Sequence, residues 1–208
     1  MVSPEKVAKA NQHPHRHGAA RCKPRGFLIA GTQTVETLIS YMPAQPLLLM
    51  FPLAIVLAGF MDLISFTIPN RIPLFLAGAF VIAAAFLDMP GKIFLIHLAV
   101  GVLMLLLGVL MFACRLLGGG DAKLMAAAAL WLGFDHLLPF LFWTAALGGL
   151  LALALLTYRR FLPPIWLLGQ SWAMRLHDSR EGIPYGIAIA GAGLVVYPNT
   201  IWMTGIAG

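Results

Sequence analysis

The stretch "RLLGGGDAKLMAAAALWLG", residues 115–133, contains the features that decide the fold. Three glycines precede Asp121, and Asp121 opens a run of alanine and leucine with the character of a membrane helix. This run, residues 121–134, covers only ~21 Å at about 1.5 Å per residue, whereas the hydrocarbon of a bilayer is ~30 Å thick. The helix is therefore expected to start below the membrane surface, with the Asp121 carboxylate recessed.

The composition places the chain in a membrane. Of its 208 residues, 60% are hydrophobic and 11% are charged, whereas an ordinary globular domain carries about 25% charged residues. The expected fold is an all-α, polytopic membrane protein with about six transmembrane helices, for which the lipid bilayer acts as solvent. The other five apolar runs cover residues 46–66, 72–89, 92–114, 138–157 and 183–204.

Two regions fall outside this pattern. Residues 1–45 are expected to form a basic N-terminal extension, either disordered or lying at the membrane interface, ahead of a membrane domain over residues 46–208. The loop over residues 158–182 contains two prolines and two tryptophans. It predicts a segment lying on the membrane surface, with a re-entrant element as the alternative.

Counting spans places three features on one side of the membrane. Asp62 lies near the end of the first run, Asp121 opens the fourth, and "IPYG" (residues 183–186) opens the sixth. Connections on that side carry seven of the Lys and Arg residues, and those on the opposite side carry only Lys92. The positive-inside rule makes the side with the seven positive charges the cytoplasm. The net charge of +6 is thus a topology signal, and no nucleic-acid partner is expected.

The basic extension disagrees with this orientation, because the first of six spans ends on the cytoplasmic side and the N-terminus is therefore outside. Either residues 26–45 also cross the membrane, or the loop charges outweigh the six Lys and Arg residues of the first 25 positions. The side on which residues 1–45 lie is left open.

Asp62 and Asp121 are candidates for chemistry, because ionisable side chains inside a membrane are costly. Two carboxylates held close together share one proton and titrate as a unit. The ionised member can take a proton from water while the protonated member polarises a carbonyl. This is aspartic-type amide hydrolysis, for which no metal and no cofactor are expected. The alternatives are a helix-capping role for Asp121 and, for the pair, a small proton-coupled transporter.

The residues around the aspartates have local uses too. The three glycines keep the backbone open, either for an extended peptide to approach or as a plain flexible turn. Pro69 is expected to stop the first helix, and Asn70 to satisfy backbone groups at the turn.

Together these motifs resemble a known family. "GGGDAKL" (residues 118–124) is similar to the G-x-G-D motif of membrane-embedded aspartic peptidases, and "DLISFTIPNRI" (residues 62–72) resembles the first aspartate and I-P-N turn of type IV prepilin peptidases. "IPYGIAIA" (residues 183–190) is similar to the start of their last helix. The resemblance covers residues 46–205 and implies that Asp62 and Asp121 are the catalytic pair. The further motif residues are Gly118, Gly119, Gly120, Lys123, Pro69, Asn70, Pro184, Tyr185 and Gly186.

The resemblance also implies a substrate and a location. The expected reaction is cleavage of a type IV prepilin between its short basic leader and its hydrophobic helix, at the cytoplasmic face of a bacterial inner membrane. The implied partners are pilin and pseudopilin precursors, and the pilus assembly machinery.

Two departures from the family pattern are informative. Larger members carry a cysteine-rich insert linked to N-methylation, whereas here the link between the first two helices is short and has no cysteine. Methyltransfer is therefore not expected, and the compact form is similar to peptidases of tight-adherence (Flp-type) pili. Second, "ISFT" after Asp62 is more apolar than the basic residues common at that place, and residues 1–45 match no part of the pattern.

Overall fold

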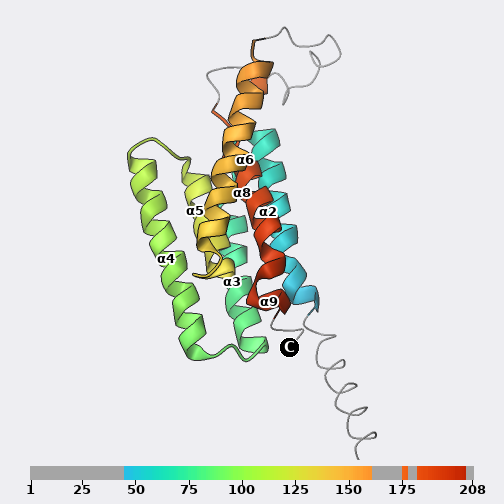
Figure 1. Ribbon diagram of the computed structural model, residues 1–208, viewed down its shortest axis with the longest axis vertical. Helices are drawn as coiled ribbons and strands as arrows, with labels where there is room; N and C mark the ends of the chain where they lie inside the picture. Colours follow the sequence, from blue (N-terminus) through green and yellow to red (C-terminus); the bar gives the residue numbers. More distant parts are fainter. Residues whose placement is uncertain (1–44, 161–174, 178–181, 205–208) are drawn as a thin grey trace, which may run out of the picture. The chain divides into compact units, whose positions relative to one another are not determined.

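The computed structural model describes residues 45–160, 175–177 and 182–204, all within one compact unit, Ile39–Gly208. No β-strand occurs in these ranges, which confirms the all-α prediction. The main helices are α2 (Gln45–Ser65), α3 (Arg71–Phe86), α4 (Gly91–Ala113), α5 (Gly119–Leu132), α6 (Leu137–Tyr158) and α8 (Tyr185–Val196), followed by the 3-10 turn η2 (Tyr197–Asn199) and the short α9 (Ile201–Thr204) (Figure 1).

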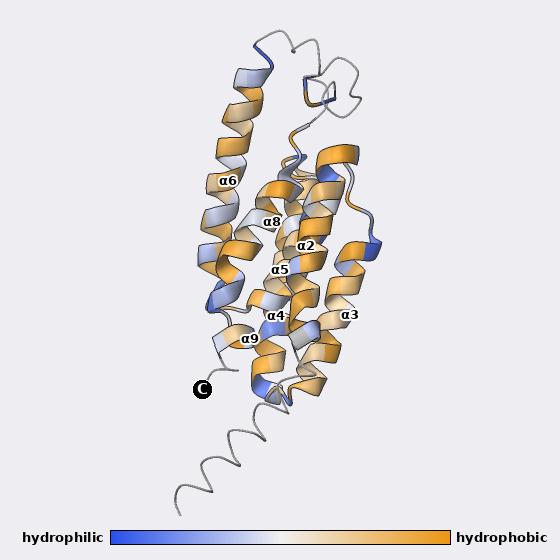
Figure 2. Ribbon diagram, turned by 90° about the vertical axis from the view of Figure 1, so that its right-hand side faces the viewer, coloured by the Kyte–Doolittle hydropathy of each residue, from blue (hydrophilic) through white to orange (hydrophobic). Residues whose placement is uncertain are grey.

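Within the described residues, four segments are long and apolar enough to cross a membrane, which makes the chain a multi-pass membrane protein. They are Pro46–Ser65, Gly91–Ala113, Leu137–Tyr158 and Tyr185–Thr204. Hydrophobic residues predominate along α2 and α3 in Figure 2. The helices α3, with 16 residues, and α5, with 14, are shorter than the ~20 residues of a typical span. The count of six spans therefore stays a prediction.

Two of the sequence-based expectations lie outside the described residues. The predicted surface segment falls mostly on residues 161–174, and the basic extension falls on residues 1–44. The boundary between extension and membrane domain at residue 45 also stays a prediction.

The short helix α5 lies inside the bundle, surrounded by the other main helices. Apart from Lys123, every residue from Asp121 to Leu132 is buried. The helix contacts α2, α3, α4, α6 and α8, and the alanines at residues 126–129 let these neighbours approach closely. A helix that is apolar all round is one that lies inside a structure. Because protein surrounds α5, its length does not have to match the thickness of the bilayer.

Aromatic rings secure the C-terminal end of α5, which is the end opposite Asp121. The Trp131 indole Nε1 donates a hydrogen bond to the Leu76 carbonyl at 2.8 Å, and the Trp202 Nε1 donates to the Trp131 carbonyl at 2.6 Å. The His97 Nδ1 donates to the Leu130 carbonyl at 2.8 Å. These bonds satisfy polar groups that would be costly to bury alone. The rings packed around Trp131 belong to Phe51, Phe80, Tyr197 and Trp202.

Successive helices run in opposite directions. The connection between α3 and α4 lies at the lower end of Figure 1, and the connection between α4 and α5 lies at the upper end. The C-terminal end of α2, the N-terminal end of α5 and the N-terminal end of α8 consequently meet. This is the arrangement that counting apolar runs predicts.

Candidate active site

Asp62 lies one turn before the end of α2 and is only 5% exposed. The chain leaves the helix at Phe66, which has a left-handed backbone with φ of 53°. The Phe66 N–H still closes the last turn on the Asp62 carbonyl at 2.8 Å. From α8, the Gly186 backbone N–H donates to the Asp62 Oδ2 at 2.7 Å. One carboxylate oxygen is thus held in place, while no hydrogen bond from the described residues occupies the other.

Asp121 lies in the first turn of α5 and is 9% exposed. Its carboxylate turns back over Gly118, where an added Cβ would lie 2.8 Å from Oδ2. The positive end of the helix dipole favours an acidic group there. Asp121 is thus in the first turn but is not the N-cap, which is Gly118 and has no side-chain capping hydrogen bond. A favourable interaction with the helix dipole is compatible with a second role in the site.

The two carboxylates face the same space. Asp62 and Asp121 both line a cavity of about 920 Å³ and an adjoining cavity of about 280 Å³, and they are close enough for their charges to interact. Two negative charges so close in a buried site are costly, so the pair is expected to hold one proton. Tyr185 and Pro184, at the start of α8, line the larger cavity.

The three glycines differ from the expected open stretch. Helix α5 begins at Gly119, two residues before the predicted start, and only Gly118 is extended, with φ of −68° and ψ of 143°. An added Cβ would lie 3.3 Å from the Phe112 ring at Gly119 and 3.1 Å from the Ile68 Cβ at Gly120. Close packing against α4 and the turn before α3 thus compensates for the weak helix propensity of glycine. All three glycines line the smaller cavity beside both aspartates.

The I-P-N turn also differs in detail from the expectation. Pro69 does not stop α2, which already ends at Ser65; it lies in the turn that follows, and its carbonyl accepts a hydrogen bond from the Ile72 N–H at 3.0 Å. The Asn70 side chain makes no capping bond to the backbone. Its Oδ1 instead accepts a hydrogen bond from the Lys123 Nζ at 2.9 Å. This contact joins the turn to α5.

The first residues of α8 pack tightly against α2 and α6. An added Cβ at Gly186 would lie 2.7 Å from the Asp62 Oδ2 and 2.8 Å from its Cβ, so only glycine fits beside the carboxylate. Pro184 is buried at the N-cap of α8. Tyr185 packs against Gly148 of α6, where an added Cβ would lie 2.9 Å from the tyrosine Cε1.

Two residues that line the larger cavity were not singled out from the sequence. Phe66 and Arg115 both face it, and both have left-handed backbones, with φ of 53° and 59°. Strained backbone of this kind gathers at functional sites. Neither residue type favours such a conformation, so no local signal could have identified them. Two other aspartates, Asp88 and Asp135, are exposed.

The fold and the site define a polytopic helical membrane protein with a buried pair of carboxylates at one end. Residues 49–153, half of the chain, match the model of the type IV leader peptidase family. The match runs from α2 into α6 and includes both aspartates. The chain therefore belongs to the type IV leader peptidase family, whose members are aspartic leader peptidases. No curated protein and no solved structure gives a significant match.

Proposed function

We propose that Asp62 and Asp121 are the catalytic pair of this leader peptidase. The observation that supports the assignment is their shared cavity: two buried carboxylates from helices far apart in the sequence line one hollow. Asp88 and Asp135, by contrast, are exposed on other connections. Buried ionisable groups within a membrane protein are costly and indicate function.

The proposed reaction needs only the pair and water. The ionised carboxylate takes a proton from water, the resulting hydroxide adds to the scissile carbonyl carbon, and the protonated carboxyl gives its proton to the carbonyl oxygen. The tetrahedral intermediate then loses a hydroxyl proton to the ionised carboxylate, while the protonated one protonates the amide nitrogen. The C–N bond breaks, the leader leaves with a new carboxyl group, and the pair again holds one proton.

The proposed substrate is a Flp-like type IV prepilin, cleaved at the cytoplasmic face. Arg115 lines the larger cavity. Arg71, at the start of α3, and Lys123, in the first turns of α5, lie at the end of the helical bundle that contains the aspartates. Lys92 lies near the start of α4, at the opposite end. This distribution supports a cytoplasmic site by the positive-inside rule.

Proteolysis without N-methylation is the second part of the proposal. Residues 66–70 alone connect α2 to α3, and they contain no cysteine. A connection of this length cannot hold a cysteine-rich insert, which is the feature that the resemblance links to methyltransfer. The pilus assembly machinery would be the next partner of the cleaved product.

The test is co-expression with a candidate pilin precursor in cells that lack other leader peptidases. Asp62→Asn and Asp121→Asn should each leave the precursor uncleaved, while the exposed-carboxylate controls Asp88→Asn and Asp135→Asn should yield mature pilin. Immunoblots of both proteins give the readout, and mass spectrometry of the mature N-terminus should show an unmethylated amine. Mature pilin from either active-site variant would refute the catalytic pair, and a methylated product would refute the second part alone.

A further inference from the structure

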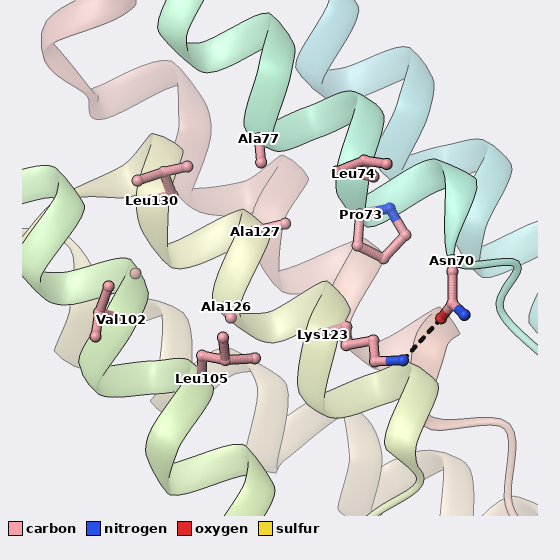
Figure 3. A pocket seen from close by; sticks show the side chains of 11 residues that line it. Asn70, Pro73, Leu74, Ala77, Val102, Leu105, Lys123, Ala126, Ala127 and Leu130 are labelled. Atoms are coloured by element: carbon pink, nitrogen blue, oxygen red, sulfur yellow. Dashed lines mark hydrogen bonds between the residues drawn. The ribbon is translucent and has the colours of Figure 1, made fainter.

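An apolar groove of about 520 Å³ lies between α3, α4 and α5. Figure 3 shows Leu74 and Ala77 from α3, Leu105 from α4, and Ala126 from α5 around it. The lining includes four small residues, Ala77, Gly101, Ala126 and Ala127. Gly101 brings α4 against Leu130 of α5, where an added Cβ would lie 3.1 Å away. Small residues of this kind let a helix approach closely in a membrane.

One end of the groove is polar and adjoins the aspartates. There the Lys123 Nζ donates to the Asn70 Oδ1 at 2.9 Å, and both side chains line the groove (Figure 3). Asn70 also lines the smaller cavity that contains Asp62 and Asp121. A single side chain is therefore a shared wall between the apolar groove and the carboxylate pair.

The two cavities and the groove adjoin one another in a row, and their lining changes from polar to apolar along it. The largest is lined by both aspartates, Arg115 and Tyr185; the smallest adjoins it and shares both aspartates; the groove follows beyond Asn70 and is almost wholly apolar. A chain lying across the aspartates would thus meet a polar cavity on one side and an apolar groove on the other.

We propose that this groove binds the apolar segment that follows the cleavage site of the precursor, while the largest cavity receives the leader. The inference rests on the proposed function, because the aspartates mark the point where the two parts of the substrate divide. The groove supplies the side-chain contacts that drive association of helices in lipid. It thereby sets which bond of the precursor lies over the carboxylates.

The first test fills the groove. Ala77→Phe places a ring in it, and the matched control Val81→Phe lies on the same helix at an exposed position that does not line the groove. Cleavage of the full precursor should fall about tenfold or more for Ala77→Phe only. A water-soluble peptide that spans the cleavage site but lacks the apolar segment should be cleaved equally by both variants and wild type.

The second test is independent of catalysis. In a Cys22→Ser, Cys114→Ser background carrying Asp62→Asn, Leu105→Cys should form a disulfide with a cysteine placed in the apolar segment of the precursor. The neighbouring control Leu106→Cys, exposed at 63% and outside the groove, should not. Equal crosslinking at both positions, or none at Leu105→Cys, would overturn the inference. So would unchanged precursor cleavage by Ala77→Phe together with loss of a co-purified lipid, which would make the groove a lipid site.

These outcomes are separable from failure of the proposed function. If Asp62→Asn still cleaves the precursor, the catalytic pair is wrong whatever the crosslinks show. If the aspartate variants are inactive but the groove variants behave as wild type, the pair stands and the groove inference fails.

Discussion

The Gly186 backbone N–H donates a hydrogen bond to the Asp62 Oδ2 at 2.7 Å, across a sequence separation that spans most of the membrane domain. This bond holds the start of α8 against the end of α2 and fixes one oxygen of the carboxylate beside the cavity that Asp121 also lines. It also leaves no room for a side chain at residue 186, because an added Cβ would lie within 2.9 Å of three Asp62 atoms.

We therefore predict that Gly186→Ala displaces the Asp62 carboxylate. A shift of about 1 Å in a reacting group can cost ~10²-fold in rate, so cleavage of the precursor should fall by about that factor. The measurement is the rate of precursor cleavage by purified protein. Gly78→Ala is the control, because an added Cβ there meets nothing within 4 Å. Equal activity of the two variants would contradict the positioning role of Gly186.

The carboxylate pair should behave as a unit. Because one proton is shared, removing either ionisable group abolishes both proton transfers, so Asp62→Asn and Asp121→Asn should each lose at least ~10³-fold in rate. The double variant should lose no more than the worse single variant. Single-turnover cleavage assays measure all three. Additive losses in the double variant would show that the two carboxylates act separately.

Lys123 and Asn70, which are joined by a hydrogen bond, should be coupled in their effect on the cleavage rate. Both side chains are exposed, so the bond contributes only about 0.5–1.5 kcal/mol, or roughly two- to tenfold in rate if it positions the turn beside Asp62. Lys123→Met and Asn70→Ala should each slow cleavage by about this factor. A double-mutant cycle should show that the combined variant is no slower than either one, whereas multiplied effects would mean independent roles.

Two neighbouring glycines of α6 allow a matched comparison. An added Cβ at Gly148 would lie 2.9 Å from the Tyr185 Cε1, whereas at Gly149 it would meet nothing within 4 Å. Gly148→Ala should push Tyr185 toward the larger cavity, which it lines, and raise the KM for the precursor. Gly149→Ala should leave KM unchanged. The measurement is the steady-state KM of both variants for the precursor. Identical KM values would show that Gly148 does not affect precursor binding through Tyr185.

The aromatic end of α5 should matter for stability and not for chemistry. Trp202→Phe removes the Nε1 hydrogen bond to the Trp131 carbonyl, which should lower the free energy of unfolding by about 1 kcal/mol. Thermal unfolding in detergent measures the change, with Trp143→Phe, at an exposed position on α6, as control. Activity per folded molecule should equal that of the wild type. A specific loss of activity would instead link this end to the site.

Much of the fold follows from local sequence. Apolar runs separated by proline, glycine and polar residues place α2, α3, α4 and α6 within a few residues of their observed bounds. Their alternating direction then brings Asp62, Asp121 and Gly186 to one end, since each helix must return across the same layer. The shortness of α5 also indicated a recessed Asp121, which is buried.

Contacts between distant segments decided the rest. The Asp62–Gly186 bond, the Lys123–Asn70 bond and the left-handed backbone of Arg115 depend on how helices pack, and no local pattern specifies packing. For the same reason, the groove between α3, α4 and α5 exists only as a relationship among three helices. Hydrophobicity along the chain determined which segments form helices and which end bears the carboxylates. Only the tertiary structure decided how the carboxylates are held and what lies beside them, because those features arise from side chains that meet after folding.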